Sequence, residues 1–303
     1  MGRVLIADPI DESAIAEIKA AGHEIVVRNK ETDRPIESQI QGFDCVVVRS
    51  ATKITSEVIE AADKLRLIVR AGVGLDNVDR DAATKRGIAV QNTPEAPTVS
   101  VAEMVFSLML ALARNIPQAV SSMKAERWDK KKLAGSELWK KSLGIIGFGK
   151  IGREVAARAK AFEMDILCYD VLNIDQVCAD MGGRSCGVEE LITNSDYITV
   201  HVPLVPQTKG MIGEKEFRMM KETAFLINTS RGGVVDEKAL LKALNEGDIA
   251  GAALDVFENE PPLDWDLVKH PKLIATPHLS SSTEEAQARV GELTARKVIQ
   301  GLK

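Results

Sequence analysis

The order of apolar and polar residues predicts an α/β fold built from parallel strands. Two observations carry this prediction. Short apolar strands alternate with helical stretches along all 303 residues, and one strand–glycine–helix–strand unit lies between Leu143 and Asp170. Strands that alternate with helices are typical of βαβ units, in which a helix returns the chain to the start of the next parallel strand. The chain is long enough for two domains, each with its own core.

The first third of the chain supplies the elements of one domain. We expect its strands at residues 4–7, 24–27, 45–48, 65–69 and 88–90. We expect its helices at residues 12–20, 56–61 and 79–85. A longer helix at 99–113 is apolar on most faces, which predicts that it is buried between domains or subunits.

A glycine-rich segment, Gly147-Phe-Gly149-Lys-Ile-Gly152, opens the second domain. Gly147 permits a tight turn, Gly149 lets the backbone approach a pyrophosphate, and Gly152 lets the helix pack closely on the strand. The amides of Lys150 and Ile151 then lie at a helix N-terminus, which favours an anion. The alternative, a glycine-rich turn without a ligand, does not account for the flanking strand and helix.

Asp170 ends the strand that follows this helix. Its carboxylate is expected to accept hydrogen bonds from the ribose hydroxyls of a dinucleotide and to repel a 2′-phosphate. The sequence therefore predicts NAD, and not NADP, as the cofactor.

The remaining strands of this second domain are expected at residues 197–201, 225–228, 250–255 and 273–275, and a last helix at 284–301 comes too late to belong to their sheet. We therefore predict a discontinuous substrate-binding domain at 1–98 and 280–303, and a dinucleotide-binding domain at 99–279. A cleft between two such domains is a common place for a ligand site.

Arg231, Asp255 and His278 follow strands of the second domain, at the edge where open α/β sheets bind ligands. A histidine supplies a proton acceptor with a pKa near neutrality, and a carboxylate beside it orients the ring. Two acids, Glu258 and Glu260, are candidates for that carboxylate. An arginine binds a substrate carboxylate through charge-assisted hydrogen bonds. This set of residues predicts hydride transfer at a hydroxylated carbon next to a carboxylate.

The composition and net charge argue against a protein that binds nucleic acid, associates with a membrane or is secreted. A formal net charge of −5 supplies no general attraction for nucleic acid or an anionic membrane, and no apolar run approaches the ~20 residues that span a bilayer. The chain enters a strand at once, so we expect no signal peptide. The four cysteines form no C-x-x-C pair, which indicates small core residues in a reducing compartment. We expect a cytoplasmic enzyme without a metal.

The sequence resembles the D-isomer-specific 2-hydroxyacid dehydrogenases over essentially the whole chain. Besides the glycine motif, the matching stretches are residues 48–53, 70–77, 92–95, 122–128, 230–233, 254–257, 260–261 and 276–278. The resemblance implies two Rossmann-like domains with parallel sheets, a flavodoxin-like substrate domain and an NAD-binding Rossmann domain, with the active site in the cleft. It also implies that Arg231 binds substrate, that Glu260 is the histidine's partner, and that His278 is the acid/base.

The resemblance further implies contacts with cofactor and substrate. Asp255 is implied to contact the nicotinamide amide. The residues implied to line the cofactor are Val202, Pro203, Thr229, Ser230, Asp255, Ser280 and Ser281. Some relatives carry threonine in place of Val202, and glycine or alanine often follows the histidine where this chain has two serines. The loop after residue 72 is implied to bind the substrate carboxylate through amides near Val73 and Gly74.

Two cations favour a phosphorylated substrate. Arg49, followed by Ser50, and Arg70 each end a strand, where they suit a phosphate better than separate surface ion pairs. The resemblance is strongest to members that oxidise D-3-phosphoglycerate to 3-phosphohydroxypyruvate for serine biosynthesis. The alternatives are a glyoxylate or hydroxypyruvate reductase of the same family and a non-metabolic NAD-sensing corepressor.

We expect a homodimer, because the apolar 99–113 helix and an extended 123–138 segment are hard to bury within one domain. In relatives this region embraces a second subunit. The run Lys130–Lys132 reads as a solvated charge cluster, or as a basic edge reaching the partner's substrate phosphate. Longer members append a serine-sensing domain; with the chain ending at Lys303, we expect no feedback by that route.

Overall fold

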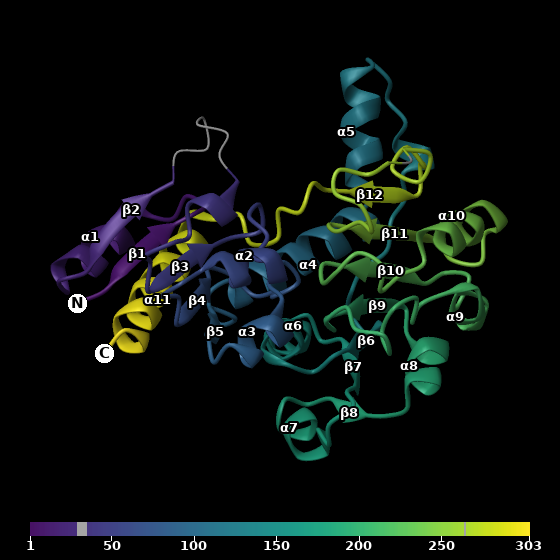
Figure 1. The fold of residues 1–303 in the computed structure, drawn as a ribbon. Coiled ribbons are helices and arrows are strands. Elements are labelled where there is room, and N and C mark those ends of the chain that lie inside the picture. Colours follow the sequence, from purple (N-terminus) through teal and green to yellow (C-terminus); the bar gives the residue numbers. More distant parts are fainter. Residues whose placement is uncertain (29–34, 264) are drawn as a thin grey trace. The chain divides into compact units, whose positions relative to one another are not determined.

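The computed structural model describes residues 1–28, 35–263 and 265–303. The chain forms two compact units, one of residues 1–97 with 281–303 and the other of residues 98–280 (Figure 1). We call them unit 1 and unit 2. Each contains one sheet in which all paired strands are parallel, which confirms the predicted α/β class.

Unit 1 has a five-stranded sheet in the order β2-β1-β3-β4-β5. Its strands are β1 Arg3–Ile6, β2 Glu24–Val27, β3 Cys45–Val48, β4 Leu67–Arg70 and β5 Ala89–Asn92. Its helices are α1 Glu12–Ala20, α2 Ser56–Ala61, α3 Arg80–Lys85 and α11 Glu284–Gly301, with a 3-10 turn, η2, at Ile36–Ser38. This is the strand order of flavodoxin, in which the direction of winding reverses between β1 and β3.

Both faces of the unit 1 sheet are covered, so its central strands are apolar on both sides. Leu5, Val46 and Ile68 face one apolar cluster. Val4 and Val69 face the other, which α1 and α11 cover together. Figure 1 shows α11, in yellow, beside α1, in purple, although the two helices come from opposite ends of the sequence.

Unit 2 has a seven-stranded sheet in the order β12-β11-β10-β9-β6-β7-β8. Its strands are β6 Ser142–Ile146, β7 Asp165–Tyr169, β8 Arg184–Ser185, β9 Tyr197–Val200, β10 Phe225–Asn228, β11 Gly251–Leu254 and β12 Leu273–Ala275. Its helices are α4 Thr98–Ala113, α5 Ile116–Lys124, α6 Lys150–Ala161, α7 Asp175–Asp180, α8 Val188–Asn194, α9 Glu214–Met219 and α10 Glu237–Glu246, with a 3-10 turn, η3, at Lys130–Lys132. Counted from β6, this is the Rossmann strand order 3-2-1-4-5-6, extended by β12 at one edge.

Two details of unit 2 differ from the sequence-based expectation. Val105, Met109 and five other residues of α4 belong to the apolar core of unit 2, where the helix packs on α6, β10 and β11, so that much of α4 is buried without another domain. The segment 123–138 is not extended throughout, because its first two residues complete α5 and η3 follows. Among the described residues, no single helix is long and apolar enough to span a membrane, and α4 and α5 pass that test only as a pair bent by 62°.

Candidate active site

The turn between β6 and α6 depends on glycine at two positions. Gly147 has a φ of 93°, and a Cβ there would lie 2.6 Å from the carbonyl oxygen of His201, which follows β9. A Cβ at Gly152 would overlap the carbonyl oxygen of Gly147. The turn therefore closes against both its own helix and the neighbouring strand because both side chains are absent.

The start of α6 fits the phosphates of a dinucleotide. Gly149 is the N-cap and offers no side chain, and a Cβ built on it meets open space. Lys150 and Ile151, the residues whose amides we predict to face the pyrophosphate, are the first two residues of the helix. An uncrowded backbone at a helix N-terminus is the geometry that an anion requires.

Asp170 lies directly after β7 and is tied to the glycine turn. Its Oδ2 accepts a hydrogen bond from the amide of Phe148 at 2.7 Å, and its Oδ1 accepts one from the amide of Leu172 at 3.0 Å. A hollow of about 450 Å³, lined by residues 168–175 and 185–186, lies at this carboxylate. Val171 is 87% exposed there. This exposed apolar residue next to the acid fits the nucleoside half of a dinucleotide, and sequence reasoning missed it.

The other predicted cofactor residues of unit 2 follow β9 and β10. Val202 is half-buried and Pro203 is exposed, whereas Thr229 is buried. The hydroxyl of Ser230 donates to Oδ1 of Asn228 at 2.8 Å, and the Ser230 amide donates to the same atom at 3.0 Å. The side chain at the end of β10 therefore fixes the segment that leads to Arg231.

Asn228 also holds Arg231 itself. This asparagine is 1% exposed, and its Nδ2 donates to the carbonyl oxygen of Arg231 at 2.9 Å. The Arg231 guanidinium donates to the carbonyl oxygen of Ser230 at 2.6 Å. Sequence reasoning missed Asn228, although a polar residue that ends an otherwise apolar strand was a signal that could have identified it.

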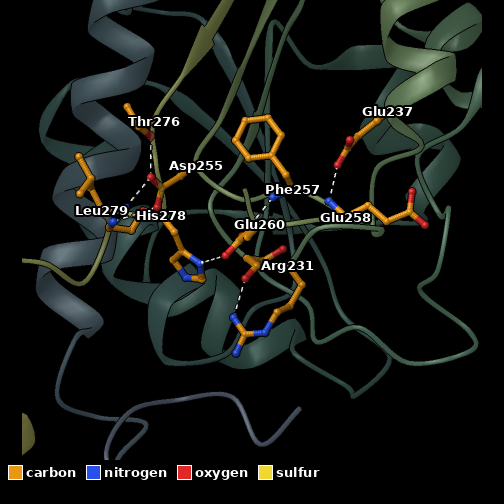
Figure 2. A network of polar contacts seen from close by, with 11 residues as sticks. Arg231, Glu237, Asp255, Phe257, Glu258, Glu260, Thr276, His278 and Leu279 are labelled. Carbon is orange, nitrogen blue, oxygen red and sulfur yellow. Dashed lines mark hydrogen bonds and ion pairs between the residues drawn. The ribbon is translucent and has the colours of Figure 1, made fainter. Parts of the chain in front are cut away.

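His278 and Glu260 form the central contact of the site. Nδ1 of His278 lies 2.8 Å from Oε2 of Glu260, with the two side chains 44% and 39% exposed, and Oε1 of Glu260 accepts from the amide of Phe257 at 3.2 Å (Figure 2). Burial alone would raise the pKa of the Glu260 carboxyl, but the hydrogen bond and charge of His278, the Phe257 amide and the charge of Arg231 together lower it. Glu260, and not Glu258, is therefore the ionised partner of the histidine.

Asp255 holds the turn that carries His278. This residue is fully buried, and its carboxylate accepts hydrogen bonds from the hydroxyl of Thr276, the amide of Leu279 at 2.7 Å, and both the amide, at 2.8 Å, and the hydroxyl of Ser280. These hydrogen bonds of Asp255 are all with other residues of the chain, and its contact with a nicotinamide amide stays a prediction.

The backbone at His278 is in the left-handed region, with a φ of 53°. Its amide donates to the carbonyl oxygens of Asp255, at 2.9 Å, and Thr276, at 3.0 Å. Such a conformation costs a residue with a side chain of order 1–3 kcal/mol and persists where the surroundings fix it. The turn around Asp255 supplies that constraint.

The two serines after the histidine fall on either side of the unit boundary. Ser280, the last residue of unit 2, is 4% exposed and gives its hydroxyl to Asp255, so this hydroxyl serves the turn. Ser281 begins the second segment of unit 1, where its carbonyl oxygen accepts from Nε2 of Gln287 at 2.8 Å. A cofactor contact of either serine stays a prediction.

In unit 1, Arg49 and Ser50 start the loop after β3, and a buried carboxylate holds that loop. Asp8, 2% exposed, accepts from the amides of Arg49 at 2.7 Å and Thr52 at 3.1 Å, and from the Thr52 hydroxyl at 2.8 Å. Nδ2 of Asn77 donates to the carbonyl oxygens of Arg49 and Thr52, each at 2.6 Å. Sequence reasoning missed both Asp8 and Asn77.

The loop after β4 contains the other predicted substrate residues. Arg70 ends the strand, and its guanidinium folds over Gly72, whose missing side chain leaves it room. The Gly72 amide donates to the hydroxyl of Thr93 at 2.8 Å, which anchors the loop just before Val73 and Gly74. The predicted cation and the predicted carboxylate-binding amides thus belong to one short loop.

Comparison with known proteins places the chain in a family. Residues 106–280 match the family "D-isomer specific 2-hydroxyacid dehydrogenase, NAD binding domain". The chain is 48% identical over 305 aligned residues to D-3-phosphoglycerate dehydrogenase of Methanocaldococcus jannaschii, covering 99% of this chain and 58% of that protein. It is 44% identical to the enzyme of the same name from Rattus norvegicus, covering 99% and 56%. The chain thus spans a little more than half the length of these relatives.

Solved structures agree with this grouping. The crystal structure of D-lactate dehydrogenase from Aquifex aeolicus, in complex with NAD and lactic acid, superposes with a TM-score of 0.87 at 30% identity, covering 98% of this chain and 94% of that one. A glyoxylate reductase from Paecilomyes thermophila superposes with a TM-score of 0.89 at 30% identity, covering 98% and 95%. The chain therefore belongs to the D-isomer specific 2-hydroxyacid dehydrogenases, and residues 106–280 are its NAD-binding domain.

Proposed function

We propose that this protein interconverts D-3-phosphoglycerate and 3-phosphohydroxypyruvate with NAD. The observation that carries the proposal is the contact of His278 with Glu260 beside Arg231. This is the set of groups needed to move a proton at a hydroxylated carbon next to a carboxylate. The choice of substrate is supported by relatives of that name at 44–48% identity.

The geometry assigns an atom to each task. Because Nδ1 of His278 is bonded to Glu260, Nε2 is the nitrogen that takes the proton of the C2 hydroxyl during oxidation. Glu260, ionised by its surroundings, then stabilises the imidazolium. Arg231 pairs with the substrate carboxylate and polarises the C2 oxygen. NAD, when bound, supplies the acceptor for the hydride that leaves C2.

Reduction of a panel of oxo acids by the purified chain, followed by NADH consumption, tests the proposal. We expect 3-phosphohydroxypyruvate to be reduced most efficiently, with NADH far better than NADPH because Asp170 repels a 2′-phosphate. His278→Ala should lower turnover by roughly 10²–10⁴-fold while NADH still binds. Preference for glyoxylate or hydroxypyruvate would favour a reductase of those acids, and NADH binding without turnover of any acid would favour a sensor.

The Arg49→Ala variant tests whether the substrate carries a phosphate. A phosphate carries close to two negative charges, and removing one paired cation costs roughly 10²-fold in kcat/KM. We expect that loss for 3-phosphohydroxypyruvate and a much smaller one for glyoxylate, which has no phosphate. An equal loss for both acids would make Arg49 a structural residue.

We also propose that a second copy of the chain covers an apolar stripe on α5. Ile116, Val120 and Met123 lie on one face of this helix and are 48%, 47% and 57% exposed. Sedimentation at micromolar concentration should give about twice the mass of the chain, and Val120→Asp should lower it. An active monomer at that concentration would contradict the proposal.

A further inference from the structure

The turn that carries Glu260 is held by a carboxylate from another element. Glu237 is the first residue of α10, and its Oε1 accepts a hydrogen bond from the amide of Glu258. The preceding amide, that of Phe257, donates to Glu260. Two successive amides of one turn are therefore bound by two different carboxylates. In Figure 2, Glu237 reaches the turn from the side away from His278.

Glu237 lies on a helix turn that is both capped and packed against the core. Asp236 caps α10, with Oδ1 accepting from the amides of Lys238 at 3.0 Å and Ala239 at 2.9 Å. Leu240 and other apolar residues of the helix are buried in the core of unit 2. A side chain on a capped and packed helix turn loses little further entropy when it binds the amide of Glu258.

A second support of the turn comes from the segment that precedes α10. A Cβ at Gly232 would overlap the carbonyl group of Phe257 and would lie 2.5 Å from the Glu258 nitrogen, so this backbone is in direct contact with the turn. Gly232 follows Arg231 directly. One short stretch of chain, 231–237, thus carries the substrate-binding arginine, the backbone surface under the turn, and the carboxylate that holds it.

The charges around Glu237 show that this bond is kept at a cost. Burial raises the pKa of the Glu237 carboxyl, the Glu258 amide opposes that, and the charges of Glu258, Asp236 and Glu260 raise it further. Glu237 therefore binds the Glu258 amide at a place where burial and three other acids disfavour a further negative charge.

We propose that Glu237 is a positioning residue for the proton transfer. By holding the amide of Glu258 it fixes the 257–260 turn, and through that turn the distance and orientation of Glu260 at His278. The inference rests on the proposed dehydrogenase function, and it assigns to Glu237 no contact with substrate or cofactor.

Three substitutions separate the hydrogen bond from the charge. Glu237→Gln keeps an acceptor oxygen at the same reach without the charge, Glu237→Asp keeps the charge but is too short, and Glu237→Ala removes both. Glu216→Ala is the matched control, because Oε2 of Glu216 accepts the amide of Gly213 at 3.0 Å at the start of α9, away from the 257–260 turn. All four variants are made in the full chain.

If Glu237 acts by position, the alanine and aspartate variants should lose about tenfold in kcat, because a displaced partner misaligns the proton acceptor. KM for NADH should stay within about twofold, and the glutamine variant and the Glu216 control should keep most of the wild-type kcat. A glutamine variant as impaired as the alanine variant, an aspartate variant that matches wild type, or an equal loss in the control would overturn the proposal.

A second measurement does not depend on turnover. The ring-nitrogen NMR signals of His278, assigned as the signals that His278→Gln lacks, should move in Glu237→Asp at one fixed pH, because Glu260 no longer lies in place at Nδ1. They should stay at their wild-type positions in the Glu216 control. If no oxo acid is reduced, the proposed function fails while this spectrum still tests Glu237. Unchanged His278 ring signals in Glu237→Asp would overturn the positioning role.

Discussion

Two buried aspartates, one in each unit, hold loops at the carboxyl ends of parallel strands, but the two loops differ in backbone strain. Asp8, after β1, fixes the loop that contains Arg49, and Asn77 donates to two carbonyl oxygens of the same loop. Asp255, after β11, binds the turn around His278 through both carboxylate oxygens, and the hydroxyl of Ser100 in α4 donates to the carbonyl oxygen of Ser280 at 2.6 Å. The turn in unit 2 also contains a histidine in the left-handed region.

This difference indicates how each region tolerates change. An unstrained loop keeps part of its geometry when one of its supports is removed. A turn with a residue in the left-handed region depends on its surroundings to keep that conformation, so the loss of one support releases the strain. We therefore expect the His278 turn of unit 2 to be the more fragile of the two, although both aspartates are buried to a similar degree.

The largest effect is expected for Asp255→Ala. The substitution leaves the buried amide of Ser280 and the amide of Leu279 without their acceptor, which should lower the free energy of unfolding by about 3–5 kcal/mol and reduce turnover by at least about 10²-fold. Urea unfolding and NADH-linked kinetics measure both. Asp180→Ala, which removes an exposed aspartate from α7, is the control, and equal stability of the two variants would refute the role of Asp255.

A smaller effect is expected for Asp8→Ala, about 2–3 kcal/mol in the free energy of unfolding. Because Asn77 still holds the loop, KM for the oxo acid should rise more than kcat falls. Adding Asn77→Ala should cost more than the two single losses combined, since both residues support one loop. Additive losses in this double-mutant cycle would contradict the expectation, because they would show that the two residues support the loop independently.

The smallest effect concerns pH. The pKa of Glu260 is lowered in the folded protein, so its pairing stabilises the fold above the ordinary value of 4.5, and this contribution disappears as pH falls through the lowered value. The stability difference between wild type and Glu260→Gln should accordingly shrink between neutral and strongly acidic pH. In kinetics, the same variant should shift the acidic or neutral limb of the pH–rate profile, because the imidazolium loses its carboxylate partner. A difference in stability that is constant with pH would contradict this account.

The pH dependence of stability has the opposite sign for Glu237, because burial and neighbouring acids raise the pKa of its carboxyl. Its ionisation weakens the fold as pH rises from 4.5 through the raised value. Glu237→Gln should therefore be no less stable than wild type at neutral pH, whereas it should lose any advantage in acid. Thermal unfolding at both pH values measures this contrast with Glu260.

Sequence reasoning named the groups that we propose to perform the chemistry, but it missed the groups that hold them in place. Arg231, Glu260 and His278 follow strands of a recognisable order, and a reactive residue type at a strand end is visible in the sequence. Asp8 binds a loop 41 residues further on, and Glu237 binds an amide 21 residues away. Such pairings depend on which strands become neighbours, so no local spacing indicates them.

The expectation that α4 is hard to bury within one domain was wrong for a different reason. A helix that is apolar on most faces must be buried, but the pattern does not say by what, and here α6, β10 and β11 cover it within unit 2. The helices α7 to α10 were not predicted from the sequence. The parallel α/β class, by contrast, followed from the alternation of strands and helices, and the flavodoxin-like and Rossmann types of the two sheets followed from the resemblance to the family.

The composition of unit 1 from two distant segments has a consequence for synthesis. Residues 98–280 leave the ribosome before residues 281–303, so unit 2 is complete while unit 1 still lacks α11. Until α11 arrives, the sheet face that contains Val4 and Val69 is covered by α1 without its second helix. A chain that ends at residue 280 should therefore bind hydrophobic dyes and chaperones through unit 1, whereas the chain that includes Val298 and its helix should not.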